Sequence, residues 1–199
     1  EVAAALPADL RPIMAAHVAA GRELRRPLRK AQTKLPAWRI VKPAPADELR
    51  AYYEEGEATY GVPWEYLAAI NLTETRMGRI RGLSTAGARG PMQFIPSTWA
   101  RYGQGDIDDP HDAILAAARY LAANGGASGN MANALYRYNP VSWYVKAVTA
   151  YAQQMEADER AYLGYHAWQV YFTTELGDIL LPVGYEATES RPVTPADLG

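Results

Sequence analysis

The feature that most constrains this chain is a succession of helical patterns in residues 46–155, bounded by residues that start or end helices. Ala46–Tyr60 is the first, and it meets Gly61, which readily takes the left-handed conformation common at helix C-termini. Pro63 suits the first position of a second helix, which continues through residues 64–70 as a largely buried segment. These boundaries predict a mainly α-helical fold.

Three further helices are expected downstream. Asp109-Pro110 combines a capping residue with a first-turn proline and opens a helix over Ala113–Ala123, which stops at Asn124 and two glycines. Asn130–Tyr138 predicts a short helix and Val141–Met155 a longer one. The longer helix is expected to bury Trp143, Val145, Val148, Ala152 and Met155.

The two ends of the chain differ from its middle. Pro43 and Pro45 lie in a stretch typical of an extended linker, whereas Gln169–Phe172 and Asp178–Leu181 flank a turn, as in a small β-hairpin. We therefore divide the chain into three parts. These are a basic, proline-interrupted and partly helical N-terminal arm with its linker (1–45), a helical domain (46–158) and an aromatic-rich C-terminal extension (159–199).

Composition and charge exclude several classes of protein. The chain has no Cys, which rules out a disulfide scaffold, thiolate zinc sites and a cysteine nucleophile. Every apolar run is interrupted before the ~20 residues that a membrane span needs. Residues 1–46 hold nine basic and three acidic side chains. Such an arm would either contact an anionic polymer or membrane surface or form a solvated leader.

No signal peptide is visible, so either the protein is cytosolic or the chain begins after processing. Aromatic side chains are unusual in kind, with 14 Tyr and 5 Trp against 2 Phe. Rings with a polar group suit half-wet surfaces on which a ligand stacks, and they also suit an outer core. Composition alone leaves both interpretations open.

The most informative residue is Glu74, because a helix expected to be buried ends on it. A carboxylate at a helix C-terminus is repelled by the negative end of the macrodipole, and partial burial further disfavours its charge. Its pKa should therefore be raised, as a general acid working near neutral pH requires. The alternative is a solvated Glu74 paired with Arg76 or Arg79.

Two later segments favour the catalytic interpretation. Ser84–Trp99 places small residues, glycines and Gln93 between two helices, where backbone can approach a ligand closely. Further on, Tyr138-Asn139 closes a short helix. Together with Glu74, these motifs resemble the catalytic domain of lytic transglycosylases, bacterial enzymes that cleave peptidoglycan strands. The resemblance spans about Tyr52–Met155 and is closest to actinobacterial secreted members and the membrane-bound B type.

The resemblance implies a lysozyme-like helical fold in residues 46–158 and a role for each matching residue. Glu74 would be the catalytic acid and base. Ser84 would contact the sugar N-acetyl group or hold Glu74, Gln93 would bond near the scissile linkage, and Tyr138 would orient Glu74 or the substrate. Two further expected site residues are Met92, for which a core role is favoured, and Asn139, which would support its turn. The last two are Trp99 and Tyr136. Their rings would bind the glycan, as would those of Tyr102 and Tyr138.

Two departures from the family pattern matter. The residue after the catalytic Glu is commonly Ser, and here it is Thr75. Some B-type relatives carry a calcium loop where this chain has residues 103–110, a segment without the ligand pattern of such a loop. We therefore expect no metal and no cofactor, with Asp109 as a helix cap and Asp106 and Asp108 solvated.

A single acid fits a substrate-assisted reaction. The resemblance implies that this reaction cleaves the β-1,4 bond between N-acetylmuramic acid and N-acetylglucosamine and leaves 1,6-anhydromuramoyl ends. Two alternatives stay open: a hydrolytic muramidase like goose-type lysozymes, and a non-catalytic peptidoglycan-binding module. The resemblance further implies an exported monomer that acts on glycan strands, with no nucleic-acid partner and no transmembrane span. Its basic arm would bind anionic wall polymer.

Overall fold

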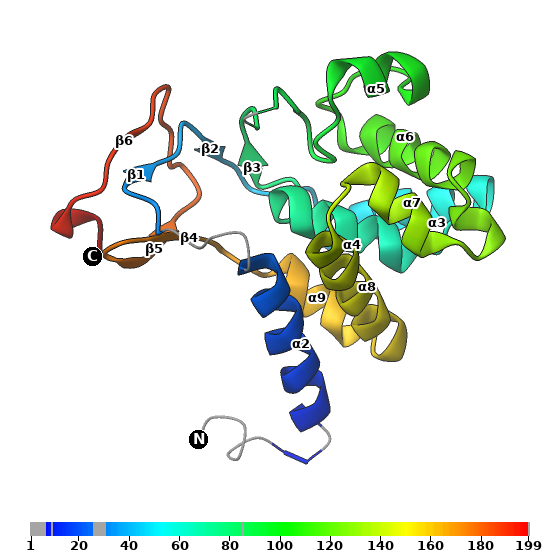
Figure 1. Ribbon diagram of the computed structural model, residues 1–199, viewed down its shortest axis with the longest axis horizontal. Helices are drawn as coiled ribbons and strands as arrows, with labels where there is room; N and C mark the ends of the chain where they lie inside the picture. Colours follow the sequence, from blue (N-terminus) through cyan, green and yellow to red (C-terminus); the bar gives the residue numbers. More distant parts are fainter. Residues whose placement is uncertain (1–6, 9, 26–30, 85, 199) are drawn as a thin grey trace.

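The computed structural model describes residues 7–8, 10–25, 31–84 and 86–198. It is mainly helical, as the sequence predicted, and a small β layer lies beside the helical body (Figure 1). The helices are α2 (Leu10–Arg25), α3 (Ala46–Tyr60), α4 (Trp64–Thr75), α5 (Pro96–Tyr102), α6 (Pro110–Ala123), α7 (Met131–Tyr138), α8 (Ser142–Ala157) and α9 (Arg160–His166), with 3-10 turns at Gly126–Ser128 and Pro195–Leu198.

Helix α4 forms the centre of the helical body and contacts α3, α6 and α8. Residues 67–72 of α4 are buried without interruption. A helix that is apolar all round must be covered on every side, and the amphipathic helices around it provide that cover. The C-terminal end of α4 is therefore fixed deep in the structure.

Most predicted helix boundaries are confirmed. Helix α3 has the predicted limits, and Gly61 caps it in the left-handed region with φ 69°. Asp109 caps α6, and its carboxylate accepts a hydrogen bond from the backbone N–H of Asp112. Pro63 differs by one position, since it precedes α4 rather than beginning it. Helices α5 and α9, each only seven residues long, were not predicted.

The predicted buried face of α8 was wrong at two positions. Trp143 and Val145 are half-buried, whereas Tyr144, Ala147 and Tyr151 are buried. The buried positions follow the i, i+3, i+4 spacing of one helix face, and Tyr144 occupies that face although it carries a hydroxyl group. The structure explains this, because the hydroxyl has a hydrogen-bond partner inside the protein.

Short antiparallel strand pairs join distant parts of the chain. Strand β1 (Lys34–Leu35) pairs with β6 (Arg191–Pro192), and β2 (Arg39–Ile40) pairs with β3 (Ile80–Arg81). The predicted hairpin is confirmed as β4 (Val170–Thr174) and β5 (Gly177–Leu181). A second hydrophobic cluster lies in this layer and consists of Leu35, Ile40, Val170, Ile179 and Leu181.

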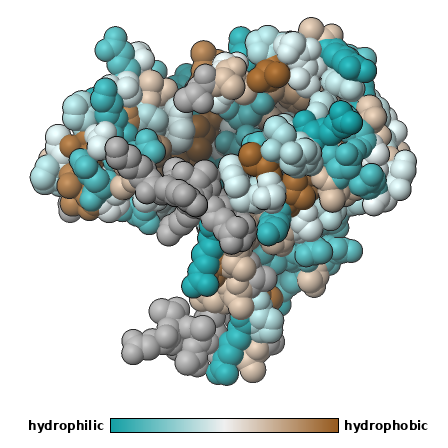
Figure 2. Space-filling model, in the orientation of Figure 1, coloured by the Kyte–Doolittle hydropathy of each residue, from teal (hydrophilic) through white to brown (hydrophobic). Residues whose placement is uncertain are grey.

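The segment before residue 46 takes part in both hydrophobic clusters. Helix α2 packs on α8, Ala20 is buried in the larger cluster, and Leu35 and Ile40 are buried in the smaller one. In Figure 2, α2 projects below the helical body and the β lobe. Four of the basic residues that define the proposed arm, residues 25, 26, 29 and 30, lie outside the described side chains. Within the described part of the chain, every helix is too short or too polar to cross a membrane.

Gly56 lies where α3 packs closely against its neighbours, so a substitution at this position tests the packing. A Cβ added there would lie 2.8 Å from Leu67 Cδ1 and 3.2 Å from Ala118 Cβ, whereas one added at Gly21 of α2 would meet nothing within 4 Å. We expect Gly56→Ala to lower the free energy of unfolding by about 1 kcal/mol through overpacking. Gly21→Ala should raise it by about 0.5–1 kcal/mol through helix propensity. Urea denaturation measures both, and equal stabilisation by the two variants would contradict this packing.

Candidate active site

Glu74 lies in the last turn of α4, and its side chain is half-buried. Its Oε1 accepts a 2.7 Å hydrogen bond from the hydroxyl of Tyr144 on α8. The two arginines considered as partners are bonded elsewhere: Arg76 Nη1 donates to the carbonyl of Leu72, and Arg79 Nη2 donates to the carbonyl of His166. The carboxyl group therefore faces a tyrosine hydroxyl rather than a cation.

Burial raises the pKa of Glu74 to about 7, although the hydrogen bond from Tyr144 opposes the shift. Burial removes water from the charged form, whereas the donated hydrogen bond stabilises that form. Both protonation states are consequently populated near neutral pH. A carboxyl group of this kind can donate a proton in one step and accept one in the next.

A buried hydrogen-bond network holds the end of α4. The Tyr53 hydroxyl donates to Asn71 Oδ1 over 2.7 Å, and Asn71 Nδ2 donates to the Pro91 carbonyl over 2.8 Å and to Thr75 Oγ1 over 3.2 Å. The Thr75 hydroxyl itself donates to the Pro91 carbonyl over 2.6 Å and accepts from the Gly78 N–H over 3.0 Å.

Every donor in this network has an acceptor, because both protons of the Asn71 amide and the hydroxyl protons of Tyr53 and Thr75 are used in hydrogen bonds. Asn71 and Thr75 are fully buried, so the loss of any partner would leave an unsatisfied group. The network stabilises three consecutive left-handed residues, Arg76, Met77 and Gly78, which turn the chain directly after Glu74. Thr75 thus uses its hydroxyl group to hold this turn.

The loop after β3 is held mainly by its own backbone. Ser84 Oγ accepts hydrogen bonds from the N–H groups of Ala86 and Ala88, over 3.2 and 3.0 Å. Gln93 has a left-handed backbone with φ 52°, and its Nε2 donates to the Gly90 carbonyl over 3.1 Å. Ser84 therefore shapes the loop, and its bonds place it with loop backbone rather than with Glu74.

Tyr138 and Tyr144 stand side by side at the site. Their rings are parallel within 3°, with centroids 6.4 Å apart. The Tyr138 hydroxyl donates to the Met92 carbonyl over 2.6 Å, so it ties α7 to the loop while Tyr144 makes the bond to Glu74. Tyr138 was expected to orient either Glu74 or the substrate. In the structure the tyrosine that bonds to Glu74 is Tyr144.

Four other residues were expected at the site, and they differ in exposure. Met92 is fully buried and leaves no surface for a ligand, so it belongs to the core rather than to the expected substrate contacts. Asn139 caps α7 through its backbone N–H. Trp99 is half-buried with its ring against Phe94, at a centroid distance of 5.7 Å. Tyr136 is 52% exposed and faces solvent.

Tyr136 lines a polar hollow of about 640 Å³ between α5, α6 and α7. Tyr102 and Tyr120 also line it, together with Asn124 and Asn133. Tyrosine faces combined with side-chain amides match the alternating apolar faces and hydroxyl groups of a sugar. The hollow adjoins Tyr138, since the ring of Tyr120 packs edge-on against that of Tyr138 at 5.3 Å.

The acidic segment before α6 is held by internal bonds. Asp108 forms an ion pair with Arg89 at the surface, and its side chain is still 44% exposed, so its carboxylate is solvated as expected but has a partner. Asp106 Oδ1 accepts from the Asp108 N–H. Asp109, His111 and Asp112 have potential ligand atoms within 4.8 Å of one another. Asp109 and Asp112 are engaged by backbone N–H groups and His111 by Glu55. The absence of a structural calcium stays a prediction.

Two residues of the site escaped the sequence analysis. Tyr144 was passed over because it is one of several aromatic residues in α8, although its place on the buried face was available from the helical spacing. Asn71 was within the quoted motif around Glu74 but had no assigned role. A fully buried amide on an apolar helix needs partners, and this requirement is the property that could have identified it.

Comparisons with known proteins agree with this geometry. Residues 51–161 match the model of the family described as "Transglycosylase SLT domain", and the chain therefore belongs to this family. It is 35% identical over 81 residues to "Membrane-bound lytic murein transglycosylase F" of Thiobacillus denitrificans, a match covering 41% of this chain and 17% of the relative. A second relative, "Membrane-bound lytic murein transglycosylase F 1" of Alkalilimnicola ehrlichii, is 35% identical over 80 residues, covering 39% and 16%.

The matched stretch thus spans about a sixth of the length of these curated relatives. No solved structure matches the chain. The mainly helical, lysozyme-like fold expected from the sequence is the fold of this family. The closer likeness to actinobacterial and B-type members stays a prediction.

The network predicts losses of stability of different size for two substitutions of Thr75. Thr75→Val keeps the size of the side chain but leaves the Gly78 N–H without a partner, so we expect a loss of about 2–3 kcal/mol in the free energy of unfolding. Thr75→Ser keeps the hydroxyl and removes one methyl group, for a loss of about 1 kcal/mol. Urea denaturation distinguishes them. A valine variant as stable as wild type would show that the network contributes nothing to stability.

The raised pKa of Glu74 makes stability depend on pH. The unfolded state ionises near 4.5 and the folded state near 7, so the wild type loses stability as pH rises between these values. Glu74→Gln removes this penalty and should be more stable than wild type by about 3 kcal/mol above about pH 8, with no difference near pH 4. Thermal unfolding across this pH range provides the measurement. Parallel stability curves would contradict the raised pKa.

Proposed function

We propose that the protein is a lytic transglycosylase that cleaves the β-1,4 bond between N-acetylmuramic acid and N-acetylglucosamine in peptidoglycan. The observation that carries the proposal is the state of Glu74. In a chain of the transglycosylase SLT family, this carboxyl group is half-buried, has a pKa of about 7 and is held by Tyr144 at the end of a rigid helix.

In the proposed mechanism, protonated Glu74 donates its proton to the glycosidic oxygen as the bond to the anomeric carbon breaks. The N-acetyl carbonyl of the muramoyl sugar stabilises that carbon. The carboxylate then removes the proton of the C6 hydroxyl, whose oxygen attacks the anomeric carbon and forms a 1,6-anhydro ring. No water is consumed, and the attacking group belongs to the same sugar, so proximity favours the step.

The positions of the other acids support this mechanism over hydrolysis. An inverting or retaining hydrolase needs a second carboxylate at the scissile bond. Asp108 is paired with Arg89, and Asp109 caps α6. Both carboxylates therefore have structural partners, whereas Glu74 does not depend on either. A hydrolytic muramidase and a non-catalytic binding module are the alternatives that the experiment distinguishes.

The surroundings of the site suggest how a glycan would be held. We assign the hollow lined by Tyr102, Tyr120 and Tyr136 to sugar binding, and Gln93 and Tyr138 to contacts with the sugar at the scissile bond. The printed names of both relatives include "membrane-bound" and "murein". We accordingly place this chain outside the cytoplasm as a monomer acting on peptidoglycan strands, without a cofactor, and its basic N-terminal segment against anionic wall polymer.

The experiment is mass analysis of the products released from purified peptidoglycan. A transglycosylase yields muropeptides lighter by one water than the products of hydrolysis. Glu74→Gln should reduce the rate of release at least about 1000-fold, because general acid and base roles both disappear. Glu65→Gln is the matched control, since Glu65 lies on the same helix about 14 Å away and should stay within about twofold of wild type.

Three outcomes would contradict the proposal. Products of hydrolytic mass would identify a muramidase. Binding to peptidoglycan without any release by the wild type would indicate a binding module. Release by Glu74→Gln at the wild-type rate would exclude Glu74 as the acid.

A further inference from the structure

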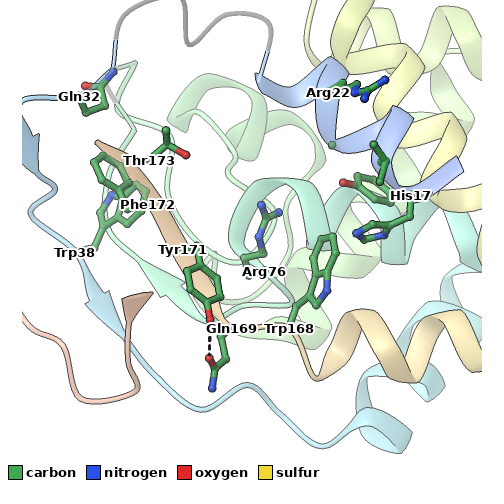
Figure 3. A pocket seen from close by; sticks show the side chains of 13 residues that line it. His17, Arg22, Gln32, Trp38, Arg76, Trp168, Gln169, Tyr171, Phe172 and Thr173 are labelled. Carbon is green, nitrogen blue, oxygen red and sulfur yellow. Dashed lines mark hydrogen bonds between the residues drawn. The ribbon is translucent and has the colours of Figure 1, made fainter. Parts of the chain in front are cut away.

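Two large cavities of the protein differ in polarity. One, of about 620 Å³, lies between α2, β4 and Arg76 at the end of α4, and Figure 3 shows the rings of Trp38 and Trp168 around it. The other is the hollow of about 640 Å³ between α5, α6 and α7, whose lining includes Arg101 and Arg137. This polar hollow therefore offers cationic groups to a ligand in addition to the tyrosine rings and amides described above.

The two guanidinium groups of the hollow are not neutralised by the protein. Arg101 and Arg137 are exposed, and neither forms an ion pair with a carboxylate of the described residues. Ten described residues line the hollow, and none of them is acidic. Burial raises the pKa of Tyr120 and Tyr102 adds to that shift, whereas the positive charge of Arg137 opposes it. The charge of Arg137 thus acts inside the hollow.

The sequence around the hollow accounts for its positive charge. Residues 75–155 contain eight basic and four acidic side chains, although the whole chain has a net charge of −2. The four acidic residues all lie within 106–112, at the N-terminal end of α6, where backbone N–H groups and Arg89 engage them. Tyr120 and Asn124 bring the opposite end of α6 to the hollow. The acidic residues of this segment therefore lie away from the hollow and already have partners.

A series of tyrosines connects the hollow to the candidate acid. Tyr120, in the wall of the hollow, packs edge-on against Tyr138. Tyr138 stacks beside Tyr144 at a centroid distance of 6.4 Å, and the Tyr144 hydroxyl donates to Glu74. In the proposed reaction the sugar at Glu74 is muramic acid, and muramic acid alternates with glucosamine along the strand. A strand that extends from Glu74 along these rings would bring a further muramoyl unit, with the carboxylates of its peptide, to the hollow.

The lining of the hollow matches the chemistry of such a unit. A guanidinium group can bind a carboxylate through two parallel hydrogen bonds. Tyrosine faces and side-chain amides fit the sugar and its N-acetyl group. A neutral strand without peptides would use the rings and amides but leave both guanidinium groups without a partner.

We propose that this hollow binds a peptide-bearing muramoyl unit of the strand, and that Arg101 and Arg137 bind carboxylates of its stem peptide. The identity of the ligand rests on the proposed function. The two arginines thereby make the enzyme selective for strands that keep their peptides over bare glycan.

The direct test is calorimetric titration of the full chain with a disaccharide tetrapeptide in which N-acetylglucosamine precedes N-acetylmuramic acid. This ligand lacks the bond that the proposed reaction cleaves, so it binds without turnover. We expect its binding to weaken as salt concentration rises. The same ligand with its carboxylates amidated should bind at least about fivefold more weakly, because the ion pairs are lost.

Protein variants locate the interaction in the hollow. Arg101→Gln and Arg137→Gln should each weaken binding of the acidic ligand about fivefold, the effect of one solvent-exposed ion pair. Neither should change binding of the amidated ligand, because the interaction is already absent from it. Lys146→Gln is the control, since it removes an exposed charge of α8 that does not line the hollow, and it should bind both ligands like wild type. Thermal unfolding checks that the variants keep the wild-type stability.

Equal affinity for the acidic and amidated ligands would overturn the proposal. An equal loss of affinity for both ligands in the arginine variants would also overturn it, because the arginines would then act through the structure of the hollow. Equally tight binding of the disaccharide without its peptide would exclude the peptide carboxylates. Tighter binding of a glycerol phosphate polymer, with the same dependence on Arg101 and Arg137, would assign the hollow to wall polymer instead.

The binding test and the product analysis are independent of each other. An inactive protein that binds the acidic ligand through both arginines would refute the proposed function alone. An active transglycosylase without any preference for the acidic ligand would refute the role of the arginines alone.

Discussion

The position of Glu74 depends on a small buried hydrogen-bond network in which Asn71 and Thr75 bind the Pro91 carbonyl. This network joins the last turn of the central helix to the loop that carries Gln93. It allows the chain to turn sharply through three left-handed residues directly after Glu74. Because each polar group in it is satisfied, the carboxyl group is held in one place while remaining buried enough for its pKa to reach about 7.

The sequence predicted the helical body well because local rules decide it. Gly61, Asp109 and Asn130 lie at the predicted helix ends, where backbone conformation and capping chemistry act within a few residues. The candidate acid was found for the same reason, since its place at the end of a buried helix follows from local pattern. Motif spacing added the likeness to transglycosylases, which the family match supports.

Contacts between distant segments could not be read from local pattern. The bond from Tyr144 to Glu74 joins residues 70 positions apart, and the pairing of β1 with β6 joins the two ends of the chain. Strands of two residues carry no periodicity, so the sequence placed residues 34–40 in an arm although Leu35 and Ile40 are core residues. These same terminal segments enclose the cavity beside Arg76, which explains why motif analysis did not find it.

The protonation of Glu74 is measured by NMR titration of its ¹³C-labelled side-chain carboxyl group. The Glu74→Gln variant identifies the signal. We predict an apparent pKa of about 7 in the wild type and a higher value in Tyr144→Phe, because loss of the donated hydrogen bond destabilises the carboxylate. A wild-type value near 4.5, the ordinary value for Glu, would show that Glu74 is ionised at neutral pH and is not poised as a general acid.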